Sequence, residues 1–200
     1  MRIIDMTNDP RRSQYEYFRT FANPYVSLTV QCDITPLKGR KPFFLSVLYC
    51  AVNAANSVAE LRRRIVGEQV VEYENCLSSH TVALPDETYC YCELDCAKPF
   101  EEFIPYALAE VEKAKASPSM EDEDVNRLYF VSSVPWVSFS SVRLPLPMPA
   151  DSNPRITFGK AYESDGKYLM PVDLTVHHGL ADGIHIAKFF QAFEENCKQI

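Results

Sequence analysis

The alternation of apolar and polar positions predicts strands in several parts of the chain. In residues 25–33 the apolar side chains occupy every second position, as they do in a half-buried strand. The same reasoning predicts strands at 65–66 and 70–71 as one hairpin, one or two strands within 81–93, a strand at 129–139, and 155–162 with 167–176 as a second hairpin. Turn residues separate the members of each hairpin, including Gly67 in the first and Gly166 in the second.

Apolar residues recur at helical spacing in other segments. Residues 43–55 are so rich in apolar side chains that we expect a buried helix, and 100–116 and 184–198 also show a helical period. A shorter amphipathic helix is expected over residues 10–21, with Asp9 as its cap. Strands outnumber helices and their connections are mixed. The expected fold class is therefore α/β (α+β), a two-layer sandwich in which helices cover one face of a mixed, largely antiparallel sheet.

The composition narrows the class of protein further. The chain has 200 residues, of which 46% are hydrophobic and 12% aromatic. This fits a single compact domain over residues 1–200 with a substantial core. The formal net charge of -7 argues against nucleic acid as the main partner, because neutralising phosphates requires a basic face. Signal-peptide and membrane-helix patterns are absent from the sequence, so we expect a cytoplasmic protein with no membrane partner.

Seven cysteines lie mostly within apolar segments. An odd number of thiols in such positions fits buried free cysteines in a reducing compartment better than a disulfide framework. Cys90, Cys92 and Cys96 together with His80 raise the question of a metal site. Their spacing matches no zinc template, and Cys90 and Cys92 alternate as strand residues do, so we expect no metal site.

Residues 177–183, with the sequence His-His-Gly-Leu-Ala-Asp-Gly, carry the most chemistry. They follow a predicted strand and precede a predicted helix, so the two histidines lie at a strand end and Asp182 at a helix start. A neutral imidazole removes protons well near pH 7. A carboxylate at a helix N-terminus caps the helix and can hold a cation. Adjacent strand residues face opposite sides, so only one histidine can face a given cleft.

The pattern His-His-x-x-x-Asp-Gly resembles the signature of the CoA-dependent acyltransferases: chloramphenicol acetyltransferase, the dihydrolipoyl acyltransferase cores and the peptide-synthetase condensation domains. Residues 11–18, 131–139 and 157–160 resemble the N-terminal helix, the central strand and the Thr-Met-Gly-Lys segment of the chloramphenicol acetyltransferase family. They occur in the same order, at nearly the same spacings, and span almost the whole chain. The lipoyl acyltransferase cores share the histidine motif but not the Arg-Arg helix start or the Pro-Trp strand.

This resemblance implies an acetyl-CoA-dependent O-acetyltransferase with no permanently bound cofactor, acting by direct attack without an acyl-enzyme. His178 corresponds to the general base and Ser132 to the hydroxyl that stabilises the oxyanion. Asp182 corresponds to a structural carboxylate paired with an arginine, a position that Arg11 fits. Thr157 corresponds to a hydroxyl that orders water near the intermediate.

The resemblance also implies partners. Lys160 lies where the family contacts CoA, and the family is a homotrimer with active sites between subunits, the base coming from one chain and much of the acceptor pocket from the next. Tyr17 and Phe18 are candidates for lining the substrate pocket, because aromatic walls suit an acceptor with an aryl ring. Trp136 has the same possible role, with core packing slightly favoured, and His177 is expected to be a packing or interface residue.

The departures from the family pattern fall mainly on the acceptor side. Asp9 stands where the family has tryptophan, residues 84–89 replace a segment with His-x-Gln, and the loop at 144–154 is shorter and richer in proline. The acceptor is therefore chloramphenicol or a different small hydroxylated molecule. A non-catalytic trimeric binding protein is the alternative of another class. The joint presence of four residues argues against this alternative: Arg11, Ser132, His178 and Asp182.

Overall fold

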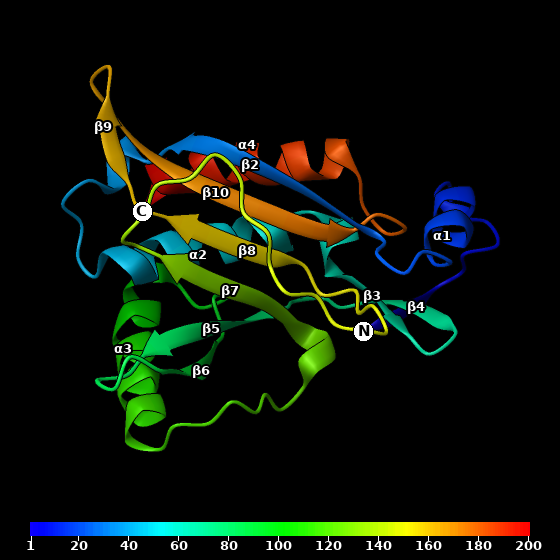
Figure 1. Ribbon diagram of the computed structural model, residues 1–200, viewed down its shortest axis with the longest axis horizontal. Helices are drawn as coiled ribbons and strands as arrows, with labels where there is room; N and C mark the ends of the chain where they lie inside the picture. The colour runs from blue at the N-terminus through cyan, green and yellow to red at the C-terminus, as the bar shows by residue number, and fades with distance from the viewer.

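The computed structural model describes all 200 residues as two layers, a large sheet with helices on one face (Figure 1). The sheet order is β2 (Tyr25–Asp33), β10 (Lys167–His177), β8 (Arg155–Gly159), β7 (Leu128–Val134), β5 (Leu77–Ala83) and β6 (Tyr89–Leu94), with β9 (Tyr162–Ser164) paired to β10. β7 runs parallel to β5 and β8, and the remaining pairs are antiparallel. The predicted fold class, a mixed and largely antiparallel sheet covered by helices, is confirmed.

Three long helices lie behind the sheet as Figure 1 shows it: α2 (Phe43–Asn56), α3 (Phe100–Ala116) and α4 (Gly183–Gln199). One core of 35 buried residues joins these helices to the sheet, and all seven cysteines are free and buried. Short 3-10 turns occur at Thr35–Leu37, Ala59–Arg62 and Val125–Arg127. None of the helices combines the length and apolarity needed to span a membrane.

A smaller sheet and a short helix lie at one end of the molecule. This sheet has the order β1 (Arg2–Ile4), β4 (Gln69–Glu72) and β3 (Arg63–Val66). The helix α1 (Arg12–Phe18) stands apart from the other helices, beyond the end of β10 (Figure 1). Tyr15 of α1, Val70 of β4 and Leu180 form a separate small apolar cluster. This cluster docks α1 against the turn that follows β10.

The strand register gives the large sheet two chemically different faces. Val131, Phe158 and Val172 occupy the face toward the helices and belong to the core. Ser132 and Thr157 are paired across β7 and β8, so their side chains share the opposite face. The loop between β7 and β8 crosses in front of that face (Figure 1).

Most predicted elements are present close to their expected bounds, including the strand at 25–33, the long helices and the hairpin at 63–72. The helix expected over 10–21 is shorter, Arg12–Phe18. The strand expected over 129–139 ends at Val134, because Pro135 has no N–H to continue the ladder and the chain turns there. The prediction that Trp136 packs in the core is wrong, because this residue is 73% exposed. The sequence analysis did not predict β1.

Candidate active site

His178 lies in the turn between β10 and α4. β10 ends at His177, and the His178 N–H donates to the Pro24 carbonyl at 2.7 Å, which fixes the turn against the chain before β2. The N–H groups of Leu180 and Ala181 then donate to the His177 carbonyl. The backbone on both sides of His178 is therefore hydrogen-bonded.

The His178 imidazole is held in one orientation by two contacts. Its Nδ1 lies 3.2 Å from the Ala181 carbonyl oxygen. A carbonyl only accepts, so Nδ1 carries the ring proton and Nε2 keeps its lone pair. The Phe18 ring stacks on the imidazole with centroids 4.1 Å apart and planes 19° apart. The side chain is half-buried, so Nε2 belongs to an oriented base that is not sealed in the core.

Arg11 and Asp182 brace this turn from its two ends. Arg11 Nη1 donates to Asp182 Oδ2 at 2.5 Å, and its Nη2 donates to the His178 carbonyl oxygen at 3.0 Å. Burial would raise the pKa of Asp182, but the hydrogen bond and charge of Arg11 outweigh it and hold that pKa below its usual value. Asp182 Oδ1 also accepts from the Ile184 N–H and caps α4. One guanidinium thus joins α1, the histidine turn and α4.

His177 faces inward, away from the position of its neighbour. It is 4% exposed, and its Nδ1 accepts from the Gly179 N–H at 3.1 Å. A Cβ at Gly179 would lie 3.0 Å from the His177 ring, so a side chain there would crowd it. Burial lowers the pKa of His177 to about 4. His177 is accordingly a neutral packing residue near pH 7.

Ser132 lies in a different part of the molecule, at a hollow of about 320 Å³ on the sheet face opposite the helices. Tyr89 and Tyr91 of β6 line the same hollow, with ring centroids 6.1 Å apart. Thr157, the register partner of Ser132, is fully buried, and its hydroxyl has no hydrogen-bond partner within the chain. Buried hydroxyls normally have a partner, so the Thr157 hydroxyl is available to bind a water molecule or a substrate group.

The structure does not bring His178 and Ser132 together within one chain. Ser132 pairs with Thr157, which pairs with Asp173 of β10, five residues before His178. Strand spacing makes this roughly 10 Å across the sheet and about 16 Å along it. One imidazole and one hydroxyl so far apart cannot act on the same carbonyl. The two halves of the predicted site are separate in this chain.

The other candidates divide between these regions. Phe18 contacts His178, and Tyr17, 61% exposed, lies edge-on to Phe18, so both belong with the histidine turn and not with the Ser132 hollow. Lys160 is exposed and lies at a second hollow of about 290 Å³, on the helix side of the sheet. That hollow is mostly apolar, with Phe43, Phe44 and Phe158 in its lining.

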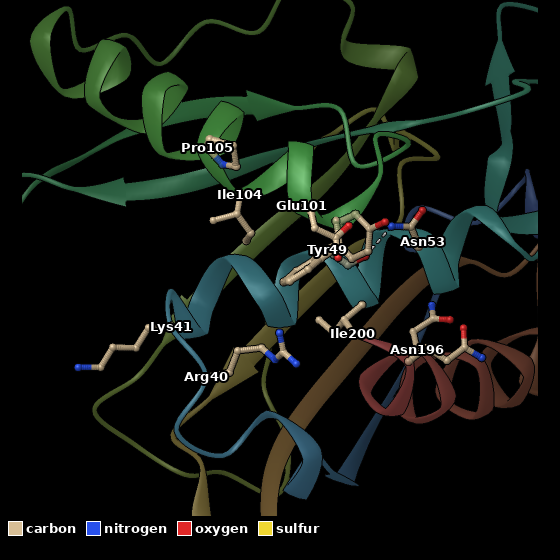
Figure 2. Close-up of a pocket in the computed structure, with 11 residues that line it drawn as sticks. Arg40, Lys41, Tyr49, Asn53, Glu101, Ile104, Pro105, Asn196 and Ile200 are labelled. Atoms are coloured by element: carbon tan, nitrogen blue, oxygen red, sulfur yellow. Dashed lines mark hydrogen bonds between the residues drawn. The ribbon is translucent and has the colours of Figure 1, made fainter.

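A larger hollow of about 820 Å³ lies between α2, α3 and the end of α4 and contains none of the candidate residues (Figure 2). Asn53 Nδ2 donates to the Tyr49 and Cys96 carbonyl oxygens, so its amide donors are used within the chain. Arg40 lies 5.5 Å from the centre of the Phe100 ring. Size alone does not make this hollow the site, because it contains neither His178 nor Ser132.

The sequence analysis missed several residues of the Ser132 hollow. Ser79, Asp122 and Arg155 all line it, although they come from three distant segments. Tyr89 and Tyr91 carried a usable signal, because two aromatic residues two positions apart in a strand face the same side. No local pattern connects Asp122 to Ser132, since the hollow is formed only when β5, β6 and β7 pair.

Comparison with known proteins assigns the family. Residues 1–194 match the family model described as chloramphenicol acetyltransferase. The chain belongs to the chloramphenicol acetyltransferase family. Chloramphenicol acetyltransferase 3 of Escherichia coli is 29% identical over 205 residues, covering 97% of this chain and 95% of the relative. A solved chloramphenicol acetyltransferase superposes with a TM-score of 0.85 at 25% identity, covering 98% of this chain and 99% of that chain.

The shared fold extends beyond this family. The dihydrolipoamide acetyltransferase of Azotobacter vinelandii superposes with a TM-score of 0.68 at 16% identity, covering 94% of this chain and 86% of that chain. That likeness concerns the fold alone. Family membership confirms the resemblance drawn from the sequence motifs, and it makes this chain an acyltransferase of a family that uses acetyl-CoA.

Proposed function

We propose that this family member is an acetyl-CoA-dependent O-acetyltransferase in which His178 acts as the general base. The observation that carries the proposal is the fixed imidazole: Nδ1 is committed to the Ala181 carbonyl, Phe18 holds the ring, and Nε2 keeps a free lone pair. Nε2 takes the proton of an acceptor hydroxyl as its oxygen attacks the thioester carbonyl carbon. The C–S bond then breaks, and the CoA thiolate takes the proton back from the imidazolium.

Ser132 is the proposed donor to the oxyanion that forms during attack. A hydroxyl aimed at the developing charge in a water-poor site stabilises the transition state by several kcal/mol. Thr157 lies beside it with a buried and unpartnered hydroxyl, which suits the proposed role of ordering one water near the intermediate. Arg11 and Asp182 do not touch substrate in this proposal. They are positioning residues for the histidine turn.

The two substrates are proposed to meet at Ser132. The hollow at Ser132 is the proposed acceptor pocket. Exposed Lys160 is the proposed contact for a phosphate of CoA. Tyr17 and Phe18 are proposed to reach the acceptor from the His178 side, because they stand next to the base.

The complete site is proposed to form between chains of a homotrimer. The separation of His178 from Ser132 supports this, since each chain would supply His178 to one neighbour and Ser132 to another. Cytoplasmic location remains a proposal, supported by the seven buried free thiols.

Release of CoA thiol from acetyl-CoA tests the function, with and without chloramphenicol, for the wild type and for His178→Ala. Chloramphenicol-dependent release in the wild type that is lost in the variant would support both the base and the acceptor. Release only with other alcohols in a panel would keep the chemistry and change the acceptor. Undiminished release by a folded His178→Ala variant would remove His178 as the base.

A further inference from the structure

The Ser132 hollow has an electrostatic character that the acyl-transfer chemistry does not require. Asp122 lies in its wall, and Asp122 Oδ1 accepts a hydrogen bond from the buried Ser79 hydroxyl at 2.7 Å. Arg155 is the one cation of the lining. Both of its terminal nitrogens are bound to the Asp151 carboxylate, at 2.8 and 2.6 Å, so its charge is already matched.

The surroundings of Asp122 add negative charge and supply no cation to it. Glu93 and Glu123 lie close by, with the Glu123 N–H donating to Glu93 Oε1 at 2.8 Å. Burial raises the pKa of Glu93, and the nearby charges of Asp122, Glu123 and Asp124 raise it further. The carboxylates therefore make the electrostatic potential negative at this wall of the hollow.

Two tyrosines complete the wall. Tyr89 and Tyr91 stack with their planes 30° apart, and both line the hollow with Asp122. Burial raises the pKa of Tyr91, and the neighbouring Tyr89 phenol and Asp122 carboxylate raise it further, so the Tyr91 phenol stays neutral. Neutral aromatic faces beside a carboxylate are the surroundings that bind organic ammonium groups.

We propose that the acceptor of this enzyme carries a cationic ammonium group, which Asp122, Tyr89 and Tyr91 bind while the acceptor hydroxyl lies at Ser132. This rests on the proposed function and names the substrate class for the same pocket. It differs from a neutral acceptor such as chloramphenicol, which brings no charge to match Asp122.

The register also sets the size of the acceptor. Ser79, which holds Asp122, pairs with Phe130, two residues before Ser132 on the adjacent strand. Strand geometry then places the Cα atoms of Ser79 and Ser132 roughly 8 Å apart. The acceptor class is therefore a small molecule whose hydroxyl and ammonium lie at opposite ends of a flat or apolar body that fits the hollow of about 320 Å³.

A pair of isosteric alcohols tests this, 2-[4-(trimethylammonio)phenyl]ethanol and 2-(4-tert-butylphenyl)ethanol, which differ in charge and not in shape. Acetyl-CoA thiol release and calorimetric binding are measured for the wild type, Asp122→Asn and Glu121→Gln. Asp122→Asn keeps the acceptor for the Ser79 hydroxyl, and Glu121→Gln removes an exposed charge of the same loop. The wild type should favour the cation by about tenfold in kcat/KM and in binding. Asp122→Asn should abolish that preference, and Glu121→Gln should retain most of it.

The outcomes separate this inference from the proposed function. Equal use and equal binding of the two alcohols by the wild type would overturn the ammonium proposal, as would an equal loss for both in Asp122→Asn. Asp122-dependent binding of the cation in a protein that releases no thiol with any alcohol would support the pocket assignment and refute the acetyltransferase proposal. His178-dependent turnover of both alcohols without charge preference would support the acetyltransferase proposal and refute the ammonium pocket.

Discussion

His178 and Ser132 lie in surroundings of opposite character. The histidine turn is held entirely by its own chain: Arg11 ties it to Asp182, Pro24 and Ala181 supply carbonyl oxygens, and Phe18 covers the ring. Ser132 stands at an open hollow, beside a Thr157 hydroxyl that is buried and without a partner. The same chain therefore carries a braced imidazole in one region and an open hydroxyl pocket in another.

The difference shows how the predicted site divides its tasks. A general base must be oriented before the substrate arrives, because proton transfer depends on hydrogen-bond geometry. The oxyanion side must instead leave room for two substrates. In the proposed site, the braced imidazole of one chain and the open hydroxyl pocket of another meet across an interface.

The largest effect is expected when the two halves are broken in different chains. His178→Ala and Ser132→Ala should each be nearly inactive alone, while a trimer assembled from an equal mixture should recover about one quarter of the wild-type rate, because a quarter of the interfaces join two intact halves. The measurement is thiol release after refolding the two variants together. Mixed protein as inactive as its components would mean that the site is not shared between chains.

The second largest effect is expected for Ser132→Ala alone. Loss of one oxyanion donor should lower kcat roughly 10²–10³-fold, with a smaller change in KM, because the contact is made only in the transition state. Ser138→Ala, in the exposed loop after β7, is the matched control and should stay within about twofold of the wild type. A small change at Ser132, or an equal change at Ser138, would contradict the role assigned to Ser132.

Acid should destabilise both regions, because each contains a buried histidine. His177 lies in the histidine turn, and His80 lies opposite Val131, next to Ser132 in the chain. Burial lowers the pKa of each to about 4, below the unfolded value near 6.5. Between these values the unfolded chain binds more protons, so the free energy of unfolding should fall as pH decreases, by about 1.4 kcal/mol per pH unit for each histidine.

Denaturant unfolding at a series of pH values measures this slope. The loss should begin near pH 6.5 and the histidine contribution should level off below pH 4. His80→Leu should remove about one histidine's share of the slope, since a leucine binds no proton in either state. An unchanged slope in that variant would show that His80 does not contribute to acid unfolding.

The smallest effect is expected from changing how the histidine turn is braced. Arg11→Lys keeps the charge but cannot reach Asp182 and the His178 carbonyl with the same two-pronged geometry. We expect a loss of about 1–2 kcal/mol in unfolding free energy. The fall in kcat should exceed the change in KM, because the base is less well oriented. Arg12→Lys, in the exposed pair with Glu16, is the control and should change both quantities little.

Equal values of kcat and of unfolding free energy for Arg11→Lys and Arg12→Lys would contradict the bracing role of Arg11. It would mean that the histidine turn does not need the contact to α1. Measuring kcat at a temperature where both variants are fully folded separates positioning from simple destabilisation, since global unfolding then no longer lowers the rate.

Local sequence patterns predict most helices and strands of this protein and the motif that contains His178. Strand periodicity gave residues 25–33, helical periodicity gave 43–55, and the spacing of His178 and Asp182 placed a histidine before a capped helix. These features depend on neighbours within a few positions, which is the range over which backbone periodicity and capping act. The family resemblance likewise came from short motifs in a fixed order.

Contacts between residues far apart in the sequence are visible only in the folded chain. Asp122 reaches Ser79 across 43 residues, and Arg11 reaches Asp182 across 171. The strand predicted through Trp136 ends before it, and the tryptophan stays exposed. Pairing of β5, β6, β7 and β8 sets the polar face, the hollow and the distance between His178 and Ser132. Strand order and register depend on long-range contacts, so no local pattern along the chain specifies them.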